Sequence, residues 1–190
     1  MSATAVDHEH DQDLDLAVRF LQQTPTHEGR DPALLRQWAL AAQEFGSRLA
    51  PRPCRARVVE RDGGLTELLL ARYRSRPATV ELYTDTIAFA EALIDARGWR
   101  DRYPKGSVRA AALAHECAHE QLHHGPTRVA LKQALGHTVL RLGRRSVHAH
   151  VAGAEELAAH AYARTVCGLG RSPLLLTEAL TEALAARREN

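Results

Sequence analysis

Residues 115–119 hold two histidines and a glutamate with the spacing His-Glu-x-x-His. On an α-helix, positions four apart lie about 40° from each other around the axis, so the imidazoles of His115 and His119 converge on one ion. Neutral imidazoles suit Zn²⁺. Glu116 lies about 100° round from His115, beside the ion, where a carboxylate takes a proton from an activated water. The spacing indicates the zinc site of a hydrolase.

The residues around the motif predict the helix that this geometry needs. The run from Val108 to Ala114 consists mostly of strong helix formers, and nothing breaks it before Gly125 and Pro126. The alternative interpretation is a surface helix whose histidines are solvated.

A catalytic zinc commonly takes a third protein ligand. Glu156 and His160 are the candidates, because they share one face of a predicted helix that is otherwise small and apolar. In one assignment Glu156 is the ligand, His160 orients a ligand by a hydrogen bond, and Glu155 points outward. In the other, His160 is the ligand and Glu156 orients it, since zinc sites with three histidines exist. An ordinary surface ion pair is the third interpretation.

The segment from Leu113 to Gly125 resembles the active-site helix of the ImmA/IrrE-type metallopeptidases and, within that group, of ArdC-type antirestriction proteins. The segment 155–170 looks like their glutamate helix. The resemblance covers about residues 76–170 and implies a minimal zincin fold with a small sheet, whose edge strand pairs with an extended peptide. We expect the strand at 80–83 near that cleft. His160 departs from the relatives, which carry an acidic or amide residue there, and 129–145 looks like an inserted helix.

The resulting hypothesis is a metallopeptidase with one Zn²⁺ ion. The ion would be held by His115, His119 and Glu156, with Glu116 as the general base and a protein or peptide as the substrate. The residues available to stabilise the transition state are Tyr162, His123 and Tyr103, and Tyr162 is equally explained as core and His123 as a solvated residue at a helix end.

Two other classes of protein fit the motif. One is a metal-containing protein without hydrolytic activity, whose zincin fold serves in regulation or in binding DNA or protein. The other is a di-iron carboxylate helical protein, because Glu116 with His119 and Glu120 with His123 also have Glu-x-x-His spacing. The di-iron interpretation needs such motifs on two helices, and residues 155–165 contain none.

Composition places further bounds on function. The chain has 190 residues, 45% of them hydrophobic, and a net charge of +2, with arginines scattered over predicted helices, so we expect no nucleic-acid binding. No apolar run approaches about 20 residues and the first residues are acidic, so we expect a cytoplasmic protein without membrane contact. Cys54, Cys117 and Cys167 form no CxxC pair and are expected as small buried hydrophobic residues. The oligomeric state is not indicated.

The pattern along the chain predicts an α+β fold, mostly helical, with a sheet of about three strands. We expect a disordered tail over 1–12, a helical segment over 13–50 that packs on the core, and a zincin-like domain over 51–190. Within these, helices are predicted at 14–23, 32–49, 86–97, 129–142, 153–167 and 173–187, besides the motif helix. Strands are predicted at 56–60, 66–73 and 78–83, with a hairpin turn at 62–64, and a short strand or loop at 147–151.

Overall fold

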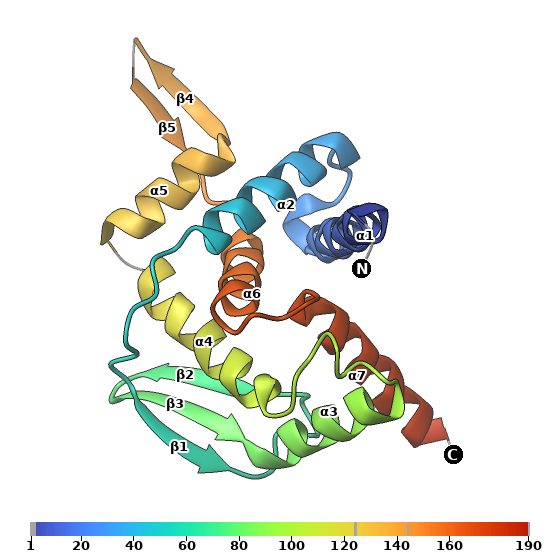
Figure 1. The fold of residues 1–190 in the computed structure, drawn as a ribbon. Coiled ribbons are helices and arrows are strands. Elements are labelled where there is room, and N and C mark those ends of the chain that lie inside the picture. The colour runs from blue at the N-terminus through green and yellow to red at the C-terminus, as the bar shows by residue number, and fades with distance from the viewer. Residues whose placement is uncertain (1–2, 124, 144, 190) are drawn as a thin grey trace. The chain divides into compact units, whose positions relative to one another are not determined.

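The computed structural model describes residues 3–123, 125–143 and 145–189 and confirms the expected α+β class (Figure 1). The helices are α1 Ala3–Gln22, α2 Pro32–Ser47, α3 Thr84–Ala96, α4 Ser107–Leu122, α5 Gly125–Leu135, α6 Ala154–Val166 and α7 Pro173–Glu189, with a short 3-10 helix at Pro25–His27. The strands are β1 Arg57–Arg61, β2 Ala71–Ser75, β3 Ala78–Tyr83, β4 Thr138–Leu142 and β5 Arg145–His148. No helix among the described residues is long and apolar enough to cross a membrane.

The chain divides into two compact units, each made of two stretches. We call residues 1–49 with 118–162 the helical unit, and residues 50–117 with 163–190 the sheet unit. The expected boundary near residue 50 coincides with the end of the first stretch. The helical unit, however, also takes in residues 118–162, which we had expected to belong with the rest of the chain after residue 50.

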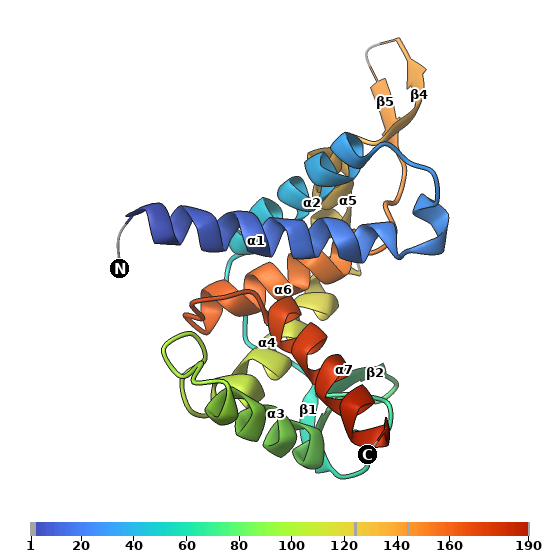
Figure 2. The same cartoon turned by 90° about the vertical axis from the view of Figure 1, so that its right-hand side faces the viewer.

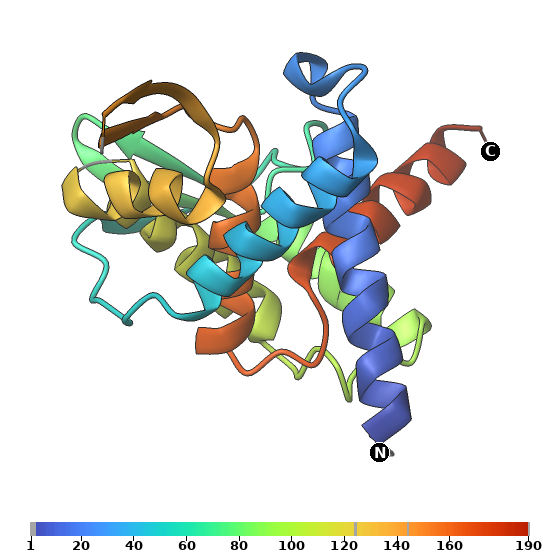
Figure 3. The same ribbon diagram turned by 90° about the horizontal axis from the view of Figure 1, so that it is seen from above.

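In the helical unit, α1 and α2 pack across each other (Figures 2 and 3). Leu21 of α1 and Trp38 of α2 are almost fully buried. The expected disorder of the tail is not found from residue 3 onward, because those residues form the first turns of α1. Arg36 of α2 holds this helix, with its guanidinium 2.7 Å from the Asp15 carboxylate and 3.6 Å from that of Asp11.

The contact between α2 and α6 depends on Gly46. A Cβ atom at this position would lie 2.0 Å from the carbonyl oxygen of Ala158, so no larger residue fits without moving backbone. Ahead of α6, the Nε2 atom of His27 lies 2.9 Å from the carbonyl oxygen of Ala152. These two contacts fix the start of α6 in the helical unit.

The predicted helix at 129–142 is wrong in its second half. α5 ends at Leu135 because Gly136 adopts a φ of +65°, which terminates the helix in the left-handed region. Thr138 and Val139 are β-branched and favour an extended backbone. β4 therefore follows and pairs with β5 in an antiparallel hairpin, which extends from the end of α5 (Figure 1).

In the sheet unit, β3 is the central strand of the order β1-β3-β2. β1 runs parallel to β3, whereas β2 runs antiparallel to it. The predicted hairpin turn at 62–64 is therefore wrong, since the chain passes from β1 to the far edge of the sheet before β2 begins at Ala71. The carboxylate of Asp85, in the first turn of α3, holds this connection through hydrogen bonds of 3.0 to 3.2 Å from the backbone N–H groups of Gly63, Gly64 and Leu65.

The first half of α4 is fixed by burial in the sheet unit. Ala112 packs in one apolar cluster with Val80 and Leu82 of β3. Val108 packs in a second cluster with Ile94 of α3 and apolar residues of α7. The turns of α4 immediately before the motif thus have a defined place on the sheet.

Candidate metal centre

α4 carries the His-Glu-x-x-His motif, so the predicted motif helix is confirmed. His115 and His119 lie one turn apart on this continuous helix, and the Nδ1 atom of each ring is buried. His119 is only 7% exposed. The spacing of the motif therefore produces the expected pair of imidazoles on one side of α4.

α6 brings Glu156 next to His119. The Oε1 atom of Glu156 lies 3.1 Å from the Nε2 atom of His119, and both residues belong to the helical unit. The His119 side chain is 9% exposed and that of Glu156 is 45% exposed. A partly solvated carboxylate thus reaches a buried imidazole from a helix more than thirty residues later in the chain.

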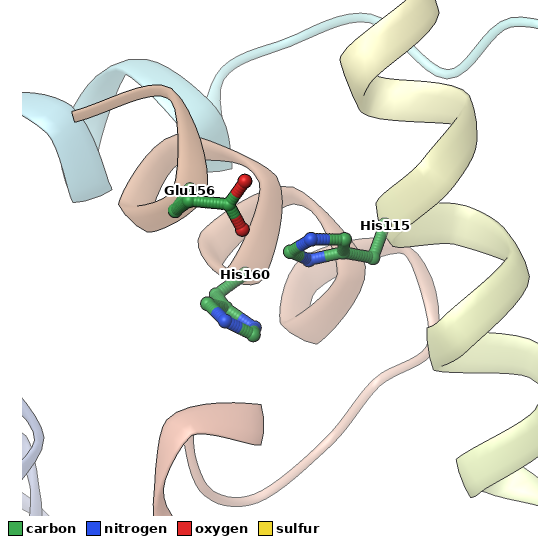
Figure 4. A group of neighbouring side chains, drawn as sticks. All are labelled: His115, Glu156 and His160. Carbon is green, nitrogen blue, oxygen red and sulfur yellow. The ribbon is translucent and has the colours of Figure 1, made fainter. Parts of the chain in front are cut away.

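His160 joins the same group from the next turn of α6. Single ligand atoms of His115, Glu156 and His160 all lie within 4.8 Å of one another. Figure 4 shows Glu156 and His160 on α6 with the ring of His115 directed toward them from α4. Both residues that could supply the third ligand are therefore grouped with the first histidine of the motif.

The donor set and its spacing fit a zinc ion. Imidazole nitrogens and a carboxylate oxygen are ligands that Zn²⁺ takes in catalytic sites. Ligands about 2.0 Å from a tetrahedral ion lie about 3.3 Å apart. The 3.1 Å separation between His119 and Glu156 is close to this value, and the ligand atoms of His115, Glu156 and His160 lie within 4.8 Å of one another, a looser spacing.

Glu116 is held by the edge of the sheet. Its Oε2 atom accepts a hydrogen bond of 2.9 Å from the backbone N–H of Tyr73 in β2. Sequence reasoning missed Tyr73, because a backbone donor leaves no signal in residue type. We had expected the strand at 80–83 beside the cleft, but β3 is paired on both sides, and the edge strand in contact with Glu116 is β2.

Glu155 does not point outward as expected. Its side chain is 14% exposed, much less than that of Glu156. Three basic side chains of the helical unit surround its carboxylate, with nitrogen to oxygen distances of 3.4 Å for His123, 3.8 Å for His150 and 3.9 Å for Arg128. These contacts direct Glu155 into the protein, and Glu156 is the more accessible carboxylate of the two.

The candidate stabilising residues differ in their surroundings. Tyr162 is 2% exposed, which agrees with a core position. The ring of His123 stacks on that of His119, with centroids 5.2 Å apart. The hydroxyl of Tyr103 donates a hydrogen bond of 2.7 Å to the carbonyl oxygen of Ser172 and so has a structural role. His123 is therefore in contact with a motif histidine.

The three cysteines form no disulfide with one another. Cys117 lies on α4 within the motif and is buried, in agreement with the prediction. Cys54 and Cys167 are half-buried rather than buried. Partial burial raises the pKa of the Cys167 thiol.

Comparisons with known proteins identify no relative: no protein-family model matches the chain, and no curated protein and no solved structure matches it either. The resemblance to the ImmA/IrrE-type metallopeptidases therefore stays a prediction carried by two segments of sequence. The geometry at α4 and α6 is independent of that resemblance.

Proposed function

We propose that this protein is a zinc-dependent metallopeptidase. The observation that carries the proposal is the approach of Glu156 on α6 to His119 of the motif, at 3.1 Å. A chance His-Glu-x-x-His on a surface helix has no reason to meet a carboxylate and a further imidazole from another helix. Here Glu156 lies beside His119, and Glu156 and His160 form one group of possible ligands with His115.

The proposed ligands are His115, His119 and Glu156, with His160 as the residue that orients them. Glu156 is favoured because it is close both to His119 and to His115. A carboxylate beside two imidazoles also matches the donor set of known peptidase sites. Zinc bound there would supply Lewis acidity, polarising the scissile carbonyl and acidifying the attacking water.

Glu116 is the proposed general base. Its Oε2 atom is occupied by the Tyr73 N–H, which fixes the orientation of the carboxylate. Glu116 accepts a proton from the attacking water, whose oxygen adds to the carbonyl carbon of the peptide. The carbon–nitrogen bond then breaks, and the proton held by Glu116 passes to the leaving nitrogen. The products are a carboxylic acid and an amine.

The experiment is the Glu116→Gln variant, assayed on a mixture of denatured proteins by the appearance of new amino groups. Glutamine keeps an oxygen that accepts the Tyr73 hydrogen bond but does not take up a proton. We expect cleavage to fall by a factor of about 10² to 10⁴ while the zinc content stays at one ion per chain. Unchanged cleavage in this variant would show that Glu116 is not the base. Zinc binding without cleavage by the wild type would favour a non-catalytic metal protein.

A further inference from the structure

The chain between the two candidate metal-binding helices contains no acidic residue. Residues 121–154, which we call the basic arm, include none of the chain's 23 aspartates and glutamates. They do include five lysines and arginines, at positions 128, 132, 141, 144 and 145. The arm thus has a formal charge of +5 in a protein whose net charge is only +2. It comprises α5, β4 and β5, and its described residues belong to the helical unit.

The hairpin of the arm exposes apolar side chains. Val139, Leu140 and Val147 are 58%, 51% and 47% exposed. Leu140 and Val147 are cross-strand partners and so share one face, and Arg141, the next residue of β4, is exposed on the other. Within the part of the chain that the structure describes, β4 and β5 form a two-stranded sheet, so each strand has one edge without a neighbouring strand. Such a hairpin offers apolar contact, positive charge and backbone hydrogen bonds together.

The arm begins and ends beside the candidate metal centre. His123, at its start, and His150, near its end, both approach Glu155, which adjoins Glu156 on α6. Both ends of the arm are therefore anchored one residue before the carboxylate that we propose as a ligand. This continuity lies within the helical unit.

We propose that the basic arm is a docking site for an acidic, extended segment of the polypeptide substrate. The charge selects an anionic partner. The exposed valines and leucine and the free strand edges favour a polypeptide over a nucleic acid, because an extended peptide pairs with a strand edge and places its side chains against apolar neighbours. The proposal rests on the proposed peptidase function, since it names the substrate class of that site.

The test measures binding separately from cleavage. The full-length Glu116→Gln protein is titrated into a fluorescein-labelled peptide that repeats Glu-Val-Asp-Leu, and the anisotropy is recorded with and without added Zn²⁺. Unlabelled competitors are the Gln-Val-Asn-Leu and Lys-Val-Arg-Leu analogues and a short DNA duplex. We expect the acidic peptide to bind, its affinity to fall with added salt, and each competitor to displace it poorly.

Arm variants locate the binding. Replacing Arg141 and Arg145 by Glu should weaken binding of the acidic peptide about tenfold or more. Replacing Leu140 and Val147 by Thr, which keeps the strand preference, should also weaken it. The matched control replaces Arg52 and Arg57 by Glu, which changes the net charge equally on exposed residues of the sheet unit. The control should retain the affinity.

Equal weakening in the control would overturn the proposal, because the effect would then be net charge alone. Preference for duplex DNA, lost in the Arg141 and Arg145 variant, would replace it with a nucleic-acid site. Cleavage of a short neutral peptide by the wild type tests the proposed function separately, and the arm variants should preserve that cleavage. Arm-dependent binding of the acidic peptide without any cleavage would leave the docking site standing and reject the peptidase.

Discussion

Glu156 and His160 lie one turn apart on α6, and only one of them completes the proposed ligand set. A residue that only orients a ligand contributes a factor of about 10 to 100 to metal affinity. We expect His160→Ala to lower the zinc affinity by a factor in this range and Glu156→Ala to lower it by more. Competition against a chromophoric chelator measures both affinities. The matched control is Glu155→Ala, which removes the adjacent carboxylate but leaves the proposed ligands. A larger loss for His160→Ala than for Glu156→Ala would reverse the two roles.

Sequence alone located the residues of the candidate site but not their surroundings. His115, Glu116 and His119 are recognisable because the spacing of residues on a helix determines the direction in which their side chains point. Glu156 and His160 followed from a polar pair on a small-residue face. The hydrogen bond from Tyr73 and the inward turn of Glu155 were missed, because they depend on a backbone group and on basic residues far along the chain.

At the scale of elements, the place of α6 depends on its approach to α2. We expect Gly46→Ala to destabilise the protein by about 2 kcal/mol or more, because the new Cβ meets a backbone oxygen that cannot rotate away. This outweighs the gain of about 1 kcal/mol from alanine in a helix. Urea denaturation measures the change. The control is Ser47→Ala, at the exposed neighbouring position, and equal stability of the two variants would show that the α2 and α6 backbones are not in close contact.

Asp85 links the connection after β1 to the start of α3. Partial burial raises the pKa of its carboxyl, but backbone hydrogen bonds from residues 63, 64, 65 and 86 outweigh this and lower the pKa below its usual value of 3.8. The stabilisation is therefore present above about pH 4 and is lost as the pH falls through the folded-state pKa. Asp85→Asn should cost about 1 kcal/mol at neutral pH. Urea titrations should show this difference shrinking toward pH 3, and a difference independent of pH would reject the charge as its origin.

The elements that sequence reasoning misjudged have two physical causes. Local pattern predicted most of the helices, because the buried side of a helix such as α2, with Leu35, Trp38 and Ala42, is set by residues a few positions apart. The pairing of β1 with β3 joins residues far apart in the sequence, so the glycines after β1 suggested a hairpin that is not formed. The apolar residues of 129–142 fit the period of a helix and also that of a strand. Gly136 and the two β-branched residues after it favour a strand in the second half of this segment.

At the scale of the whole molecule, the net charge does not reveal how unevenly the charged residues are distributed along the chain. The net charge of +2 indicated no anionic partner, yet all the acidic residues lie outside the basic arm. Scattered arginines look unremarkable unless the absence of acids between them is noticed. The lack of acidic residues in the arm can be read from the sequence. Its relevance to the candidate site follows from the position of the arm between α4 and α6.

Metal binding should stabilise the entire fold, because the proposed ligands come from two helices that an unfolded chain does not hold together. A ligand present at a thousand times its dissociation constant stabilises a protein by about 4 kcal/mol when it binds only the native state. For a chain of this size that corresponds to a rise in Tm of about 10 °C. Scanning calorimetry with saturating Zn²⁺ and with EDTA measures the difference.

Three variants test whether the rise in Tm caused by Zn²⁺ comes from the candidate site. His119→Ala should abolish most of the rise in Tm, because it removes the imidazole in contact with Glu156. Glu116→Gln should retain the rise, since the base is not a proposed ligand. Replacing His8 and His10 by Ala controls for zinc bound at the histidines of α1 and should change nothing. An undiminished rise in the His119→Ala protein would mean that zinc binds elsewhere, because removal of a true ligand lowers the affinity on which the stabilisation depends.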